Sequence, residues 1–125
     1  NAAHRLHIRD WSDKKNQEFF GLCNNNNFHG HNYELIVSIK GEIDPITGYV
    51  YDMKELSNII KTKVEKRLDH KNLNLDVPAF KNLNPSAENI AMVIYNWLKP
   101  HFSSGIDLKI RLYETPRNYV DFGDD

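Results

Sequence analysis

Residues 29–40 read H-G-H-N-Y-E-L-I-V-S-I-K, a stretch whose side chains fall into two distinct sets when every second residue is taken. Side chains of a β-strand point alternately to its two faces, so this period of two predicts a strand. One face would carry His29, His31, Tyr33, Leu35, Val37 and Ile39. The other face would carry Asn32, Glu34, Ser38 and Lys40. The strand would therefore present two histidines and then an apolar stripe on the same side.

Further strands are expected on both sides of this one. They cover residues 3–8, residues 49–51, residues 108–114 and residues 118–122. In the first of them, His4, Leu6 and Ile8 share a face. The turn sequence D-P-I-T-G at residues 44–48 would join residues 29–40 to residues 49–51 as a hairpin. Residues 10–27 carry charges, a glycine and four consecutive asparagines, which is typical of a loop that can include one turn of helix.

Two helices are expected between the hairpin and the last strands. Asp52 can cap the first, with Glu55 three residues later to complete a capping box. Its apolar stripe would comprise Met53, Leu56, Ile60, Val64 and Leu68. Residues 68–74 break this pattern, and Pro78 indicates a loop. The second helix would begin near Pro85 or Ser86 and end at Pro100, with an apolar stripe of Ile90, Ile94, Trp97 and Leu98.

Strands joined by hairpins, with the helices grouped together, predict the α+β class. We expect one antiparallel sheet with two helices on one face. The 125 residues, 1–125, are expected to form a single domain. The chain begins inside an expected strand, N-A-A-H-R-L-H-I, so we expect this N-terminal strand to be truncated.

Composition argues against several classes of protein. With 16 basic and 17 acidic side chains the net charge is −1, which argues against nucleic acid or an anionic membrane as a partner. No apolar run approaches the roughly 20 residues that a membrane-spanning helix needs. The lone cysteine, Cys23, rules out an internal disulfide and suits a reducing cytoplasm.

The two histidines of H-G-H favour a metal site. Residues i and i+2 of a strand project from one face roughly 6–7 Å apart, which suits two ligands of one ion. A catalytic zinc site usually has three protein ligands and one open position. His4, which begins another alternating face, is the natural third ligand. The alternative is a pair of solvated strand histidines. His7 and His101 are expected at the surface.

Three further residue groups could carry chemistry. Cys23 is either a small buried side chain or, on a loop near a metal, a base or nucleophile with a lowered pKa. Glu114 continues the stripe Leu108, Ile110, Leu112, so it should point to the core side of the sheet. There it needs a salt bridge or a ligand with paired N–H donors, such as a pterin or guanine edge. Asp69 and His70 form either a helix cap or a proton-transfer pair.

Six pieces of sequence occur in one order: A-A-H-R-L, C-N-N-N-N-F-H-G-H-N-Y, G-E-I-D-P-I-T-G, L-D-H-K-N-L-N, S-A-E-N and Y-E-T. Together they closely resemble the 6-pyruvoyl-tetrahydropterin synthase family over essentially the whole chain. The resemblance implies a tunnelling fold, in which the sheets of three subunits form a trimeric barrel and two trimers form a homo-hexamer. It also implies that the active sites lie at subunit interfaces.

The resemblance assigns roles to the candidate residues. Its three zinc ligands correspond to His4, His29 and His31. Cys23 would be the base that removes a proton from the substrate's side chain. Asp69 and His70 would form the proton relay.

Glu114 would anchor the pterin ring. Where animal members carry two threonines that contact the pterin, this chain has Ser86, which keeps a hydroxyl, and Ala87, which does not. Arg5 and Lys71 are candidates to receive phosphate groups.

The implied reaction starts from the small molecule 7,8-dihydroneopterin triphosphate and eliminates inorganic triphosphate. The 6-carboxy-tetrahydropterin synthases of queuosine biosynthesis use the same substrate and zinc but also release acetaldehyde. The spacer of residues 24–28 between the cysteine and H-G-H favours the pyruvoyl type. A zinc hydrolase and a non-catalytic zinc- or pterin-binding module are further alternatives. The usual hydrolase barrel needs about 250 residues, and hydration on three histidines leaves Cys23 and Glu114 unexplained.

Overall fold

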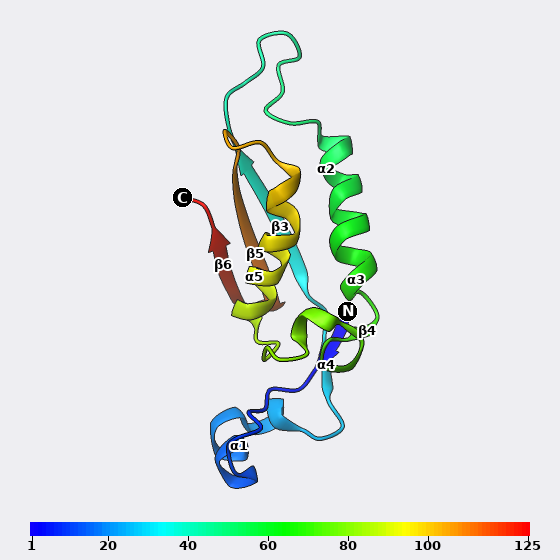
Figure 1. Cartoon of the computed structure of the whole chain (residues 1–125), viewed down its shortest axis with the longest axis vertical. Helices are drawn as coiled ribbons and strands as arrows, with labels where there is room; N and C mark the ends of the chain where they lie inside the picture. Colours follow the sequence, from blue (N-terminus) through cyan, green and yellow to red (C-terminus); the bar gives the residue numbers. More distant parts are fainter.

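The structure is a computed structural model that describes all residues, 1–125. In chain order the strands and helices are β1 (Ala2–His4), α1 (Asp13–Phe20), β2 (His29–His31), β3 (Glu34–Lys40), α2 (Met53–Ile60), α3 (Lys66–Leu68), β4 (Lys71–Asn72), α4 (Leu73–Asp76), α5 (Ala87–Leu98), β5 (Asp107–Thr115) and β6 (Asn118–Gly123) (Figure 1). A π-helical segment, Lys61–Glu65, joins α2 to α3. Short 3₁₀ turns cover Gly21–Asn24, Pro78–Phe80 and Lys99–His101. No helix is long and apolar enough to cross a membrane.

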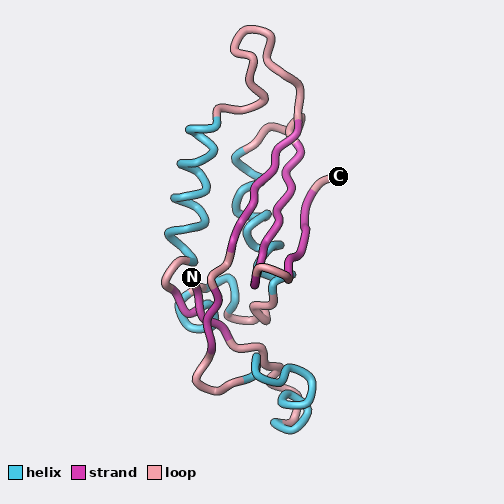
Figure 2. The backbone as a smooth tube through the Cα atoms, turned by 180° about the vertical axis from the view of Figure 1, so that it is seen from behind, coloured by secondary structure: helices cyan, strands magenta, loops and turns pink.

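The strands form two sheets of three, in the orders β2-β1-β4 and β3-β5-β6. Helices α2 and α5 lie on one side of the larger sheet, and Figure 2 shows its opposite face without a helix. The predicted α+β class with helices on one face is confirmed. The prediction of a single antiparallel sheet is wrong, because β1 pairs antiparallel with β2 but parallel with β4 in a sheet of its own.

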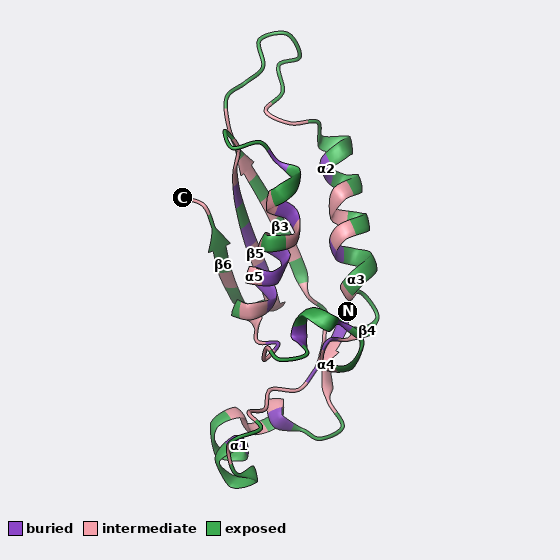
Figure 3. Ribbon diagram, in the orientation of Figure 1, coloured by how far each residue is buried: buried purple, intermediate pink, exposed green.

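The core lies between the larger sheet and the helices. Leu108, Ile110 and Leu112 of β5 are 0%, 0% and 2% exposed, as their alternation predicts. They pack with Ile94 and Leu98 of α5 in one apolar cluster, which Figure 3 shows as the buried faces of α5 and β5. Burial of each such side chain stabilises the fold by about 1.5–3 kcal/mol.

The predicted cap of α2 is confirmed for Asp52, whose carboxylate accepts from Lys54 N at 2.9 Å, but Glu55 makes no return bond to Asp52 N and the capping box is not completed. The apolar stripe of α2 starts later than predicted: Leu56 is buried, whereas Met53 is 70% exposed at the first helical position. The second helix also matches its prediction, with the Ser86 hydroxyl accepting from Asn89 N at 3.3 Å. Residues 71–76, expected as loop, form β4 and α4.

The predicted strand 29–40 is interrupted at Asn32 and Tyr33. Its first part, β2, pairs with β1, whereas its second part, β3, pairs with β5. The chain changes pairing partner between them and therefore joins the two sheets. The alternation of faces persists along β3, whose residues are exposed and half-buried in turn.

The predicted strand 3–8 ends early, at His4. The backbone beyond it bonds to asparagine side chains instead of to another strand: Arg5 N donates to Asn74 Oδ1 at 2.8 Å and His7 N to Asn84 Oδ1 at 3.2 Å. Ile8 N donates to Asn16 Oδ1 at 2.7 Å. Alternation alone could not predict this, because the partners are side chains of α1, of α4 and of the segment before α5 and do not belong to a neighbouring strand.

The expectation of a loop over residues 10–27 is wrong for α1. Ser12 caps this helix by accepting from Lys15 N at 3.1 Å. Asn16, which is 0% exposed, bonds to the backbone of Ile8 with both ends of its amide. The helix is therefore held to the chain beyond β1 by a buried amide, whereas Phe19 remains 70% exposed.

The predicted turn at residues 44–48 is present, but the returning strand at residues 49–51 is wrong. The Asp44 carboxylate accepts from Ile46 N at 2.8 Å and Thr47 N at 3.3 Å, and Gly48 has a φ of 76°. A single backbone bond, Asp44 N to Tyr49 O at 2.9 Å, continues from the turn. The loop projects beyond the sheet (Figure 1), where no neighbouring strand extends the pairing.

Candidate metal centre

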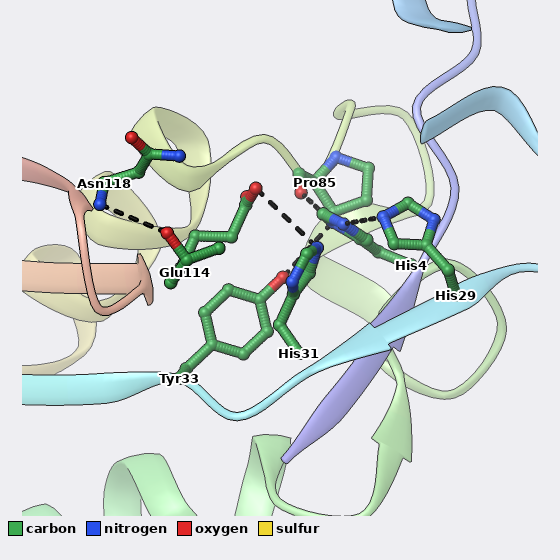
Figure 4. Close-up of polar contacts among 8 residues, drawn as sticks. His4, His29, His31, Tyr33, Pro85, Glu114 and Asn118 are labelled. Atoms are coloured by element: carbon green, nitrogen blue, oxygen red, sulfur yellow. Dashed lines mark hydrogen bonds and ion pairs between the residues drawn. The ribbon is translucent and has the colours of Figure 1, made fainter. Parts of the chain in front are cut away.

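Three imidazoles converge where β1 and β2 pair. The antiparallel register places His4 opposite His29, and His31 follows on the same face of β2. One ligand nitrogen from each of the three lies within 4.8 Å of the other two. Figure 4 shows the three rings directed toward one another. The expectation that His4 joins the H-G-H pair as a third candidate ligand agrees with this geometry.

The ring of His4 is held in one orientation. It is 0% exposed, and its Nδ1 lies 2.8 Å from the Pro85 carbonyl oxygen. A carbonyl only accepts, so Nδ1 carries the proton and the Nε2 lone pair stays free. That Nε2 lies 3.0 Å from His29 Nε2. Such a hydrogen bond behind a ligand is how proteins fix the tautomer of a metal-binding histidine.

Burial lowers the pKa of both His4 and His29, so neutral rings are favoured at neutral pH. His29 Nδ1 and His31 Nε2 are buried without any hydrogen-bond partner. A buried polar atom without a partner is unfavourable by about 1–3 kcal/mol. A cation held between neutral imidazoles would take one ring nitrogen from each histidine, and three nitrogen ligands suit zinc. The residues therefore fit a metal ion.

Glu114 and Tyr33 border the imidazoles. Glu114 Oε1 lies 3.7 Å from His31 Nε2, and its side chain is 21% exposed on the core side of β5, as predicted. The Tyr33 hydroxyl lies 3.3 Å from His4 Nδ1. Burial, and then the charges of Glu114 and Cys23, raise the pKa of Tyr33. Sequence reasoning placed Tyr33 on the histidine face but did not count it as a site residue; its position two residues after His31 was the available signal.

Glu114 and Ser86 line one hollow of about 390 Å³, together with Leu6, Ala87 and Arg117. Both predicted pterin-binding residues are therefore adjacent in space although 28 residues separate them in the sequence (114 − 86). The Ser86 hydroxyl already accepts the helix-capping bond described above, and it keeps its own O–H as a donor.

Cys23 lies in the turn Gly21–Asn24, close to Glu114 and Tyr33. Its carbonyl accepts from Leu6 N at 2.7 Å, which fixes it beside the chain that leaves β1. Neither the fully buried nor the exposed alternative is found, and the lowering of the thiol pKa by a nearby metal ion stays a prediction. Cys23 is half-buried, and burial, followed by the Glu114 charge, raises the pKa of its thiol.

Asp69 and His70 contact each other, with Nδ1 and Oδ2 3.0 Å apart, but neither contacts the three imidazoles or Cys23 within one chain. His70 has a φ of 61° and a side chain that is 76% exposed. His101 is exposed as predicted. His7 is half-buried instead, because its Nδ1 bonds to Asn24 Oδ1 at 2.8 Å.

Comparison with known sequences decides between the families that such a site could belong to. A family model described as 6-pyruvoyl tetrahydropterin synthase matches residues 1–125. The chain belongs to the 6-pyruvoyl tetrahydropterin synthase family. It is therefore an enzyme of a lyase family, and its relatives support a role in pterin biosynthesis.

Individual members of the 6-pyruvoyl tetrahydropterin synthase family agree with this. The 6-pyruvoyl tetrahydrobiopterin synthase of Homo sapiens is 42% identical over 120 residues, covering 96% of this chain and 83% of that protein. A solved structure of the Caenorhabditis elegans 6-pyruvoyl tetrahydropterin synthase has a TM-score of 0.91 and 40% identity, covering 99% of this chain and 89% of that one. A dihydroneopterin monophosphate aldolase of Pyrococcus furiosus is 32% identical over 109 residues, covering 87% of this chain and 76% of that protein.

Proposed function

We propose that this chain is a zinc-dependent lyase that converts 7,8-dihydroneopterin triphosphate to 6-pyruvoyl-tetrahydropterin and eliminates inorganic triphosphate. The observation that carries the proposal is the convergence of His4, His29 and His31 beside a cysteine and a glutamate. Family membership favours this reaction over a zinc hydrolase and over a non-catalytic binding module.

The three histidines would hold zinc through their free lone pairs. When bound, zinc would act as a Lewis acid on the substrate's side-chain oxygens, and its positive charge would lower the pKa of the Cys23 thiol. Cys23, fixed by the bond from Leu6 N, would remove the side-chain proton. Glu114 would accept paired N–H donors of the pterin ring, which a carboxylate can bind in bidentate fashion.

Ser86, which lines the same hollow as Glu114, would donate its hydroxyl hydrogen to the pterin. His70 would carry protons during the internal redistribution and elimination, and Asp69 would hold its ring in one orientation. Because His70 is exposed and separate from Cys23 within one chain, this role requires a neighbouring subunit.

We propose a homo-hexamer of two trimeric barrels as that assembly. Strands β3 and β6 are the two outer strands of the larger sheet, so each leaves one edge unpaired. Unpaired edges readily pair with another chain. The sheet face without helices, visible in Figure 2, would line the barrel. We also propose the cytoplasm as the compartment, because a lone cysteine suits reducing conditions.

The second candidate product is 6-carboxy-tetrahydropterin, from the same substrate. The relatives with the pyruvoyl name, at 40–42% identity, favour the first product. A relative with 32% sequence identity has a different name, dihydroneopterin monophosphate aldolase, so the product of this chain has to be measured.

The test is incubation of the zinc-loaded protein with 7,8-dihydroneopterin triphosphate, followed by mass spectrometry. We expect the 6-pyruvoyl product and free triphosphate without acetaldehyde. The carboxy product with acetaldehyde would establish the second candidate instead, and absence of triphosphate release would reject both. Cys23→Ala should abolish turnover while zinc stays bound, which separates an enzyme from a binding module.

A further inference from the structure

A hollow of about 490 Å³ is lined by residues that follow β1 and precede β2 and α5, and we name it the basic hollow. Arg5, His7, Arg9 and Lys81 line it together with Asn74 and Asn84, among other residues. No aspartate or glutamate is among its lining residues. A concave surface with positive charge and no carboxylate attracts anions.

Several residues that line the basic hollow are direct neighbours, in the sequence, of residues of the metal centre. Arg5 directly follows His4, and Phe28, another lining residue, directly precedes His29. Asn84 precedes the proline whose carbonyl holds the His4 ring. Any anion bound here would therefore lie next to the catalytic region and not on a remote surface.

The arginines and the lysine of the basic hollow form no salt bridge within the protein. Arg111 and Lys99 form salt bridges with Asp121 and Asp124, but Arg5, Arg9 and Lys81 form none. The Arg5 side chain is nevertheless fixed, because its Nε donates to Asn24 O at 3.0 Å. Its two terminal nitrogens keep their hydrogens for another acceptor. A guanidinium held in this way is suited to phosphate oxygens.

The amides of the basic hollow are fixed before any ligand binds. Asn74 accepts from Arg5 N at 2.8 Å and donates to Arg5 O at 3.0 Å. Asn84 accepts from His7 N through its oxygen, so its NH₂ group remains a free donor. A wall that is already ordered loses little conformational entropy on binding.

We infer that the basic hollow binds a phosphate chain. The net charge of −1 gives the whole protein no general attraction for a polyanion, so a local cluster is required to bind one. Two sources of such a chain fit the chemistry. One is the triphosphate tail of the substrate, which rests on the proposed function; the other is a separate phosphate-bearing molecule. Lys71, the other cation considered for phosphate, lines a different hollow with His70.

The first test is calorimetric titration of inorganic triphosphate into the assembled protein. The double variant Arg9→Gln/Lys81→Gln leaves Arg5, the neighbour of a metal ligand, intact. The control, Lys54→Gln/Lys61→Gln, removes the same charge from exposed positions in α2 and at the start of the π-helical segment that follows it. We expect the dissociation constant to rise about tenfold in the first variant, the effect of losing charge-assisted hydrogen bonds, and less than about twofold in the control. Equal affinity in both variants, or no binding to the unmodified protein, would overturn the inference.

The second test separates the two sources by steady-state kinetics with 7,8-dihydroneopterin triphosphate. A rise in KM of about tenfold with little change in kcat, in Arg9→Gln/Lys81→Gln alone, assigns the hollow to the substrate's tail. Weakened triphosphate binding with unchanged KM assigns it to a separate ligand. If the unmodified protein shows no turnover, the proposed function fails, and the titration still decides whether the hollow binds phosphate.

Discussion

The larger sheet is held by apolar burial, whereas the smaller sheet is held mainly by polar contacts. Leu108 and Ile110 of β5 are fully buried against α5. The smaller sheet has strands of only two or three residues, and asparagine side chains satisfy the backbone just beyond β1. The candidate metal ligands lie on the smaller sheet, and most of the core lies on the larger one.

This difference separates chemistry from stability. Hydrogen bonds are directional and set the orientation of side chains, as the Pro85 carbonyl does for His4. Apolar burial is not directional but supplies most of the folding free energy. Substitutions in the two regions should therefore affect different measurements.

The largest expected effect is on activity, from His31→Ala. Removal of one of the three candidate ligands should reduce binding of the proposed zinc ion and lower turnover by about a thousandfold, because the ion would carry the charge stabilisation. Circular dichroism should show an unchanged fold, because the ring lies outside the apolar core. His101→Ala, at an exposed histidine, is the control and should keep zinc and activity. Full activity of His31→Ala would show that the smaller sheet does not carry the chemistry.

The next effect is on stability, from Leu108→Ala in the larger sheet. A fully buried leucine replaced by alanine should lower the free energy of unfolding by about 2–5 kcal/mol. Urea denaturation measures this, and zinc per folded protein should not change. Met53→Ala, at a 70% exposed position, should stay within about 0.5 kcal/mol of the unmodified protein. If Leu108→Ala lost zinc without losing stability, the larger sheet would not be the region that supplies stability, and our comparison of the two sheets would be wrong.

Sequence reasoning succeeded where the decisive interaction is local or periodic. The stripe of β5, the caps at Asp52 and Ser86, and the shared face of His29 and His31 all follow from spacing. His4 and His29 lie 25 residues apart in the sequence, and their contact depends on the register between two strands. Alternation indicates the face on which His4 lies but does not determine that register.

Sequence reasoning failed where a distant polar group replaces a strand partner. The strand 3–8 was predicted from alternation, but Asn74, Asn84 and Asn16 take its N–H groups after His4. The polar neighbours of Cys23 in the sequence predict an exposed thiol, whereas the folded chain half-buries it, and burial raises the pKa of its thiol. The separation of His70 from Cys23 is also a property of tertiary structure that no local pattern contains.

A smaller effect is expected from Asn16→Ala, which tests the polar scaffold. The buried amide bonds to Ile8 N and Ile8 O at 2.7 and 2.9 Å, and its loss would leave both without this partner. The free energy of unfolding should fall by about 1–3 kcal/mol. Hydrogen exchange should rise in α1 and beyond β1 but not in β5. Asn26→Ala, at an exposed asparagine without a side-chain bond, is the control. Faster exchange in β5 would show that the two regions unfold together.

The smallest effect at neutral pH is expected from Asp124, which ties the end of β6 to α5. Its carboxylate accepts from Lys99 Nζ at 2.6 Å, Tyr95 Oη at 2.7 Å and Leu108 N at 3.0 Å. The bond from Lys99, followed by those from Leu108 N and Tyr95, lowers the pKa of Asp124 from 3.8 to about 2. A carboxylate with a lowered pKa contributes stability that is complete above its unfolded pKa and is lost as the pH falls through the folded one. The contribution should therefore disappear between about pH 4 and pH 2.

Asp124→Asn should accordingly lower the urea midpoint at pH 7 and flatten its decline between pH 4 and pH 2. Asp125→Asn, at the exposed neighbouring carboxylate, should leave both features unchanged. Zinc content should be the same in both variants, because Asp124 acts on the larger sheet alone. If Asp124→Asn keeps the acid-dependent decline of the unmodified protein, carboxylates elsewhere are responsible for it, and the larger sheet depends on apolar burial even more than we infer.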